Sequence, residues 1–184
     1  MYGPTLCGDH VTLQPPTAEL SAHYCRWFAD KAVNLYTLRF PPSAEMAEGW
    51  LRKAAESEKE VLWMICVEGR VIGAIQIDTI DWHHRRGEIA FVIGEREHWG
   101  KGYGTEAVRL ITRFAFEELN LEKLQGEAVA DNLGSVRAME KAGYGQYGLA
   151  RRHFFQNGRW ADSWFGEALR DTWESDQVTG TPQQ

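Results

Sequence analysis

The spacing of hydrophobic residues predicts four helices, because apolar positions recur every three to four residues and so share one helix face. These helices span residues 19–30, 43–57, 105–119 and 133–142. Ser43 is a suitable N-cap for the second helix. Gly143 follows the fourth helix, at the position where a left-handed residue commonly ends one.

Between the helices, alternating or continuous β-favouring residues predict strands. They span residues 11–13, 61–67, 71–77, 88–93 and 124–130. Residues 154–160 are expected to form a last hairpin, because Asn157-Gly158 suits a type I′ turn, and residues 32–40 a loop. Strands and helices in this order predict a mixed α/β fold with helices packed on a twisted central sheet.

Length and composition are those of one soluble globular domain. The 184 residues are 43% hydrophobic and 25% charged, and no apolar run approaches membrane-spanning length. The chain is polar from Trp173, so we expect one domain over residues 1–172 and a flexible tail over residues 173–184. Residues 1–6 lack the features of a secretory signal, which predicts a cytoplasmic protein with no membrane partner.

The net charge and the spacing of cysteine and histidine residues indicate which ligands the chain can bind. The net charge of −6 disfavours nucleic acid as the main partner and favours a cationic one. Cys7, Cys25 and Cys66 are far apart, and neither they nor the six histidines show the spacing of a metal site. We therefore expect no disulfide framework and no bound metal.

A glycine-rich segment, Trp99-Gly100-Lys101-Gly102-Tyr103-Gly104-Thr105, connects the strand at 88–93 to the helix at 105–119. Bare N–H groups in such a turn, together with the positive end of the helix dipole, make an anion cradle suited to a pyrophosphate. A P-loop is excluded because position 95 is Glu and Gly102 follows Lys101. A dinucleotide fingerprint is excluded because Thr105 stands where its third glycine belongs, which argues against a nucleotide-binding protein.

The segment resembles the acetyl-CoA loop of the GNAT superfamily of N-acetyltransferases, in particular the Rim-type ribosomal-protein N-terminal acetyltransferases. Residues 132–144 are similar to that branch's second signature, with Asn, Ser three residues later, and Lys-x-Gly-aromatic. Residues 67–73 and 157–162 resemble two of the family's hairpins, so most of residues 5–170 is covered. The resemblance implies a mostly antiparallel central sheet flanked by helices, and acetyl-CoA as co-substrate without a metal.

The resemblance also implies which residues bind the cofactor. The main chain of Phe91, Val92 and Ile93 would hold the pantetheine arm and polarise the thioester carbonyl. The pyrophosphate would lie on the loop, whose residues are Trp99, Gly100, Lys101, Gly102, Tyr103, Gly104 and Thr105. Trp99 departs from the family pattern, which usually has Gln or Arg there, but the backbone amides do the binding. Lys101, Arg137 and Lys141 would add phosphate contacts, or are simply solvated charges.

Glu88 is the candidate general base, because it resembles the strand glutamate that serves this role in several GNAT enzymes. A partly buried carboxylate can accept the ammonium proton, directly or through a water. The alternative is an exposed strand residue paired with Arg85 or Arg86.

Asn132 and Ser135 match the family's polar pair, which would bind the pantetheine arm, with Ser135 assisting departure of the thiolate. The alternative is plain helix capping. Met139 occupies the place of the usual general-acid tyrosine, and a thioether cannot donate a proton. Tyr144 is nearby, and core packing explains it better.

The sequence thus predicts an acetyl-CoA-dependent N-acetyltransferase that acts by direct transfer in a ternary complex. The acceptor would be a protein N-terminus or a small primary amine, and a homodimer is left open. By analogy, the acceptor pocket would be lined by the last hairpin and by Trp27, Tyr36, Arg39, Phe40 and Trp82. The rival is a CoA-binding regulatory module that has lost turnover; the missing tyrosine favours it slightly, and Glu88 and Ser135 oppose it.

Overall fold

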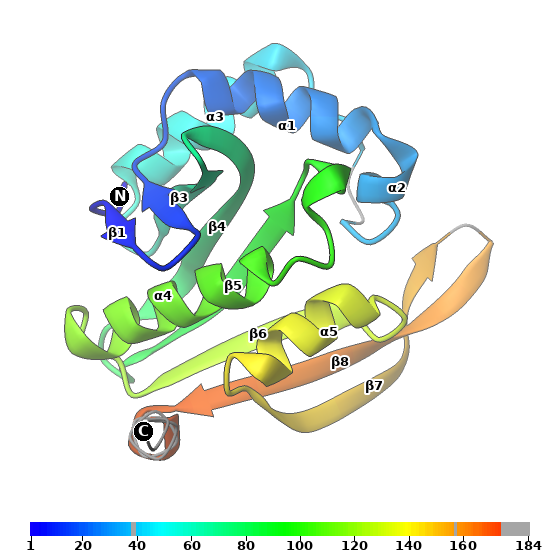
Figure 1. Cartoon of the computed structure of the whole chain (residues 1–184). Helices are drawn as coiled ribbons and strands as arrows, with labels where there is room; N and C mark the ends of the chain where they lie inside the picture. Colours follow the sequence, from blue (N-terminus) through cyan, green and yellow to red (C-terminus); the bar gives the residue numbers. More distant parts are fainter. Residues whose placement is uncertain (38–39, 157, 174–184) are drawn as a thin grey trace, which may run out of the picture.

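A computed structural model describes residues 1–37, 40–156 and 158–173, which form an eight-stranded sheet with helices on both faces (Figure 1). Along the sheet the strands follow the order β1-β2-β3-β4-β5-β6-β8-β7. Their bounds are β1 Leu6–Cys7, β2 Thr12–Gln14, β3 Val61–Val67, β4 Arg70–Asp81, β5 Arg86–Ile93, β6 Lys123–Val129, β7 Gly145–Gln156 and β8 Arg159–Leu169. Every neighbouring pair is antiparallel except β5 and β6, which run parallel. The mixed, mostly antiparallel sheet is confirmed.

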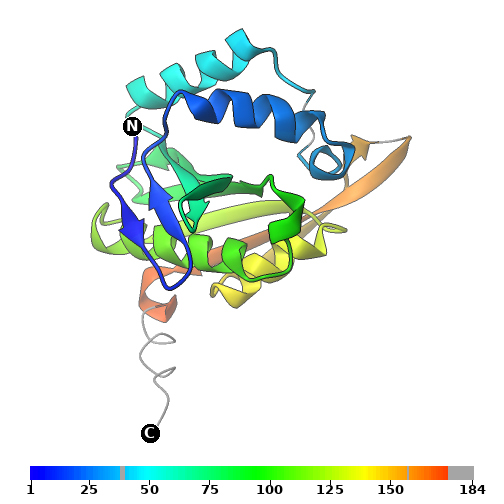
Figure 2. The same cartoon turned by 45° about the horizontal axis from the view of Figure 1, so that its top comes forward.

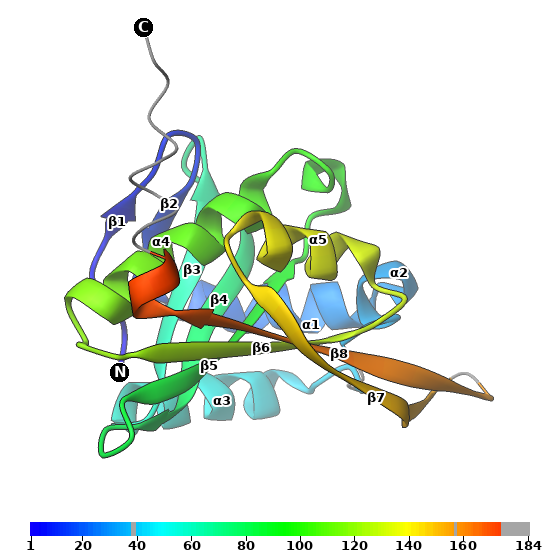
Figure 3. The ribbon, with the colours of Figure 1, turned by 90° about the horizontal axis from the view of Figure 1, so that it is seen from below.

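Two layers of helices cover the sheet (Figures 2 and 3). Their bounds are α1 Glu19–Ala29, α2 Lys31–Asn34, α3 Ala44–Glu56, the short 3₁₀ helix η1 Arg96–His98, α4 Tyr103–Glu117 and α5 Leu133–Lys141. One face carries α4 and α5, and the main hydrophobic core lies beneath them. The opposite face carries α1 and α3, which enclose a second core against β3 and β4.

The two faces are covered to different extents. On the α1 and α3 side, Leu62, Met64 and Ala74 are buried, but Glu88 and Glu127 on β5 and β6 are exposed although their side chains point to the same side. Figure 1 shows α1 and α3 lying over the β3 and β4 end of the sheet. We call the remainder of this side, which runs from Asp78 on β4 across β5, β6, β8 and β7, the open face.

The parallel pair β5 and β6 separates part-way along its length. Pairing runs from Arg86 opposite Lys123 to Ile89 opposite Gly126 and stops there. Yet β5 continues to Ile93 and β6 to Val129. The two strands fan apart in Figure 1, which leaves a gap in the middle of the sheet. Main-chain groups along this gap have no neighbouring strand to pair with.

Several local expectations need correction. The segment predicted as a loop contains α2, and β1, too short to show a period, was missed. Long strands β4, β7 and β8 extend well beyond the predicted hairpins, because β-bulges let them bend and continue. Residue 157 of the predicted turn lies outside the described residues. The Ser43 cap is confirmed by its bond to the Met46 amide, and Gly143 has a φ of +97°.

The predicted tail begins too early at Trp173. Its indole is buried, packs against Phe116 and donates a hydrogen bond to the Ala142 carbonyl at 2.8 Å. Its large apolar surface explains this position better than its polar neighbours in the sequence. Residues 174–184 lie outside the described residues, so the flexible tail stays a prediction.

Candidate active site

The predicted anion cradle leads directly into α4. Gly100 and Gly102 have φ of +73° and +89°, in the left-handed region, and α4 begins at Tyr103. Gly102 is the N-cap and supplies no side chain to bond the first N–H groups of the helix. Those groups can therefore bind an external anion, and the helix dipole favours a negative charge there.

Gly104 lies where the cradle meets the gap in the sheet. A Cβ added at Gly104 would stand 3.3 Å from the Phe91 ring on β5 and 3.8 Å from Ala138 on α5. The N-terminus of α4 thus approaches both β5 and α5 closely.

Of the three β5 residues expected to bind through their main chain, only two face the gap. The Gly94 N–H donates to Ile72 on β4 at 2.8 Å, while the Trp99 indole donates to the Ile93 carbonyl at 2.7 Å. Because main-chain groups alternate in direction along a strand, Phe91 and Ile93 present theirs to the gap. Val92 pairs with β4, and its side chain packs against the α1 and α3 core.

Glu88 is exposed on the open face of β5, one residue before pairing with β6 ends. It stands opposite Asp78 on β4 and Gln125 on β6. Partial burial raises the pKa of its carboxyl, the charges of Asp78 and Glu127 raise it further, and Arg86 opposes them. A carboxylate with a raised pKa is better suited to accept a proton near neutral pH.

The structural alternative for Glu88 has little support. Arg85 lies 2.7 Å from the Glu122 carboxylate and also bonds to Asn120. Arg86 lies 3.9 Å from Asp81. Within the described residues, neither guanidinium is at ion-pair distance from Glu88. Its carboxylate is therefore available to a ligand.

Asn132 caps α5, and Ser135 keeps a hydrogen-bond donor for its other expected role. As the N-cap of α5, Asn132 accepts from the Ser135 N–H through Oδ1 at 3.3 Å. Its Nδ2 donates to Ser135 Oγ at 2.9 Å. Since Oγ is the acceptor in that bond, the hydroxyl hydrogen of Ser135 remains able to donate to another group. Capping and proton donation are compatible here.

Neither Met139 nor Tyr144 can act as a general acid. Met139 is 1% exposed, and its sulfur lies 2.5 Å from where a Cβ on Gly126 would stand. The Tyr144 hydroxyl is 2.9 Å from Thr112 Oγ1 in the core, and burial raises its pKa. The interpretation of Tyr144 as a core residue is correct.

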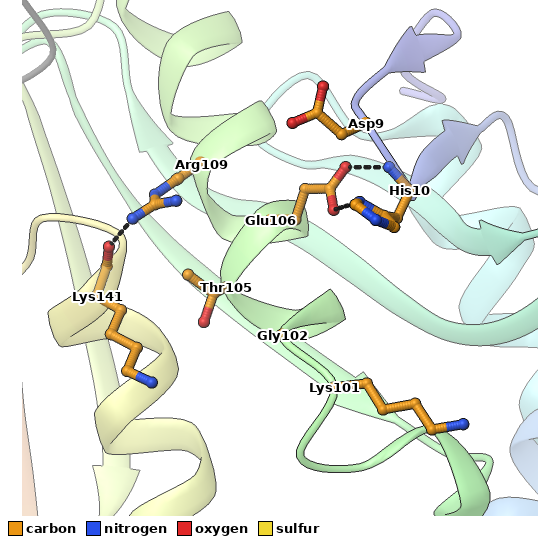
Figure 4. Close-up of a pocket in the computed structure, with 8 residues that line it drawn as sticks. All are labelled: Asp9, His10, Lys101, Gly102, Thr105, Glu106, Arg109 and Lys141. Atoms are coloured by element: carbon orange, nitrogen blue, oxygen red, sulfur yellow. Dashed lines mark hydrogen bonds and ion pairs between the residues drawn. The ribbon is translucent and has the colours of Figure 1, made fainter. Parts of the chain in front are cut away.

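The basic residues divide between a pocket and the free surface. An open pocket of about 360 Å³ beside the cradle is lined by Lys101, Gly102, Thr105, Glu106, Arg109 and Lys141 (Figure 4). Asp9 and His10 complete its rim. Arg137 does not line it and lies exposed one turn before Lys141 on α5. The sequence analysis missed Arg109, although its place four residues after Thr105 puts it on the same face of α4.

Glu106 explains how the β1–β2 turn comes to border this pocket. Its Oε1 accepts from the His10 and Val11 N–H groups at 2.8 and 3.0 Å, and its Oε2 is 3.6 Å from His10 Nδ1. The carboxylate is thus committed to holding the turn on α4. An acidic residue in the first helical turn was the available signal.

The residues expected to line an acceptor pocket do not behave alike. Trp27 is 1% exposed and donates to Glu95 at 2.8 Å, so it is a core residue. Phe40 is 93% exposed, and the Trp82 indole bonds to the Glu58 carbonyl at a sheet end. Tyr36 is partly buried, and Arg39 lies outside the described residues.

In the described part of the chain, no group of three or more His, Cys, Asp or Glu side chains could hold a metal ion. Among its helices, none has the length and apolar character needed to cross a membrane.

Comparison with known proteins agrees with this geometry. The family model described as "Acetyltransferase (GNAT) domain" matches residues 10–145. "Probable N-acetyltransferase YjcK" of Bacillus subtilis is 46% identical over 68 residues, a match that spans 37% of this chain and 38% of that protein. Spermidine N(1)-acetyltransferase of Escherichia coli is 28% identical over 60% of this chain and 59% of its own.

Solved structures share the fold. Spermidine N-acetyltransferase from Vibrio cholerae, in complex with CoA and spermine, superposes with a TM-score of 0.83. Its sequence is 22% identical, and the match covers 91% of this chain and 99% of the Vibrio chain. Because the family model matches most of the chain, this chain belongs to the GNAT family and is an acetyl-CoA-dependent N-acetyltransferase.

Proposed function

We propose that this enzyme acetylates a cationic small amine bound on the open face, with Glu88 as general base and Ser135 as proton donor to the thiolate. The observation that carries the proposal is the position of Glu88. It is an exposed carboxylate on β5, one residue before the point where β5 and β6 separate. A thioester lying in the gap would meet an amine on the open face beside this side chain.

The cofactor would bind mainly through main-chain groups. Its pyrophosphate would lie on the cradle, and its pantetheine arm would follow β5 into the gap, where Phe91 presents its N–H and C=O groups and Ile93 its N–H. An N–H group directed at the thioester oxygen would stabilise the negative charge that develops during attack. Asn132 and Ser135 would approach the arm from the start of α5.

Proton transfers would complete a direct reaction in a ternary complex. Glu88 would take a proton from the acceptor ammonium, directly or through a water, so that the neutral amine attacks the carbonyl carbon. The C–S bond would then break, and the Ser135 hydroxyl hydrogen would stabilise the departing thiolate. A thiolate is a tolerable leaving group, so Met139 in the usual tyrosine position does not prevent turnover.

The open face favours a cationic acceptor. Asp78, Glu88 and Glu127 all project onto it, and like charges on adjacent strands repel each other unless a cation lies between them. Asp78 accepts from Gln76 Nε2 at 2.8 Å, and Glu127 is bonded by Ser163 and lies 3.5 Å from His153. Within the described residues, neither carboxylate is paired with Lys or Arg.

Several carboxylates suit an acceptor with several positive charges better than a single terminal amine. The spermidine acetyltransferases similar to this chain act on such a molecule, which supports a polyamine-like acceptor. The Rim-type resemblance supports a protein N-terminus as the second candidate. Cytoplasmic location and a homodimer stay predictions.

A panel of acceptors tests the proposal through CoA release. Spermidine and spermine should give a higher kcat/KM than monoamines of similar pKa, and higher than peptides with basic or neutral N-termini. A matched diol or neutral amide should give no release above hydrolysis. Efficient turnover of peptides with none of polyamines would transfer the assignment to protein N-termini. Acetyl-CoA binding without turnover of any amine would favour a regulatory module instead.

A further inference from the structure

The basic side of the pocket beside the cradle has no assigned ligand. Arg109 and Lys141 lie together on one side of α4 in Figure 4, and Asp9, His10 and Glu106 lie on the other. Within the described residues, neither Arg109 nor Lys141 forms an ion pair. Both side chains line one pocket and have positive charges without an acidic partner, so the arrangement favours a bound anion.

The Arg109 guanidinium is already held in place. It donates through Nη2 to the main-chain carbonyl of Lys141, which joins α4 to the C-terminal end of α5. Guanidinium has five N–H donors, so others remain for a ligand. A side chain oriented before binding loses less conformational entropy when it contacts an anion.

The position of the pocket relative to the cradle indicates which anion would reach it. Acetyl-CoA carries two arms on its pyrophosphate: the pantetheine arm, and the adenosine whose ribose bears a 3′-phosphate. The first arm must enter the gap near Gly104, between Phe91 and Ala138. The second must leave the cradle elsewhere, and Gly102 and Thr105 border both the cradle and the pocket.

We propose that Arg109 and Lys141 bind the ribose 3′-phosphate of acetyl-CoA and make the enzyme select it over the 3′-dephospho cofactor. A phosphate monoester carries close to two negative charges at neutral pH, which matches two cations from two different helices. Thr105 Oγ, on the same side of the pocket, can donate a third bond. Lys101, on the loop itself, is left to the pyrophosphate.

Binding of CoA and 3′-dephospho-CoA, measured by isothermal titration, tests this assignment. The unchanged enzyme should bind CoA about 10- to 100-fold more tightly, the range expected for charged hydrogen bonds to one phosphate. Lys141→Gln and Arg109→Gln should each lose most of that preference while 3′-dephospho-CoA affinity stays the same. Arg109→Lys should keep part of it, since the charge remains.

Arg113→Gln is the matched control, because Arg113 is an exposed arginine one turn further along α4 and does not line the pocket. It should leave both affinities unchanged. Lys141→Gln keeps the main-chain carbonyl that Arg109 bonds, so it tests the phosphate contact without breaking the link between the helices. Equal binding of the two cofactors by the unchanged enzyme would overturn the proposal. So would an equal weakening of both cofactors in Lys141→Gln, which would place this lysine on the pyrophosphate.

Discussion

The cofactor side and the open face of the sheet use different parts of the chain. On the cofactor side, one continuous stretch, residues 91–105, contains the strand end, the cradle and the start of α4. On the open face, Asp78, Glu88 and Glu127 come from three strands and meet only because of the sheet register. In the proposed function, the first region would work chiefly through main chain and the second through side chains. Changes should therefore affect binding on one side and chemistry or acceptor choice on the other.

The largest expected effect is on the open face. Glu88→Gln keeps the size and hydrogen-bonding reach of the side chain but removes proton acceptance, so kcat should fall by about 10²- to 10⁴-fold. The acetyl-CoA dissociation constant should hardly change. Because burial and neighbouring carboxylates raise the pKa of Glu88, the rate of the unchanged enzyme should rise as pH passes that pKa. Steady-state rates with a low-pKa amine would measure this rise of the rate with pH, and the variant should not show it. A variant with the original rate and pH profile would make the carboxylate structural.

The next effect is on the cofactor side. Gly102 has a φ of +89°, and a Cβ there would meet nothing within 4 Å. Gly102→Val should therefore act through the backbone, because a β-branched residue cannot hold this conformation without strain. Acetyl-CoA affinity should fall about 5- to 30-fold, as the left-handed cost of about 1–2 kcal/mol implies.

Gly102→Asn provides the matched control, since Asn tolerates the left-handed region better. It should lose much less affinity by calorimetry, and circular dichroism should show both variants folded. If folded Gly102→Val bound acetyl-CoA normally, the cradle would not depend on this turn.

A smaller effect should separate acceptor recognition from chemistry. Glu127→Gln removes one carboxylate of the open face, so the KM for spermidine should rise about two- to fivefold, as for an exposed ion pair. Acetyl-CoA affinity and the KM for a monoamine should remain unchanged. Glu117→Gln, an exposed glutamate on α4, is the charge-matched control. An equal rise with both amines would contradict a role in recognising additional positive charges.

The smallest effect concerns stability. A pKa raised on folding means that protonated Glu88 favours the folded state, and this contribution is present below the unfolded pKa and lost as pH rises through the folded one. At pH 7 the ionised Glu88 side chain is repelled by the charge of Asp78, which destabilises the folded state. Glu88→Gln removes this repulsion and should raise the melting temperature by about 1–3 °C. At pH 4 the gain should shrink. Melting curves at both pH values decide it, and a lower melting temperature at pH 7 would reveal a structural partner for Glu88.

Local signals in the sequence explain why the glycine turn and the helices beside it could be predicted. Glycines with positive φ, the helix that follows them, and the Asn132 cap of α5 depend on neighbouring residues alone. Trp173 shows the opposite case. It stands beside a polar segment, yet it packs on Phe116 and bonds to Ala142, both distant in sequence. Only the folded chain brings those partners to it.

By itself, the sequence determined the helices, most strands and the main-chain cradle, because these depend on periodicity and on the backbone freedom of glycine within a few residues. The tertiary structure decided the rest. It separated β5 from β6, excluded Val92 from the gap, and placed Arg109 against the end of α5. It also gathered carboxylates from three strands on one face of the sheet. Strand register and helix packing set these positions, and both arise from contacts between residues far apart in the chain.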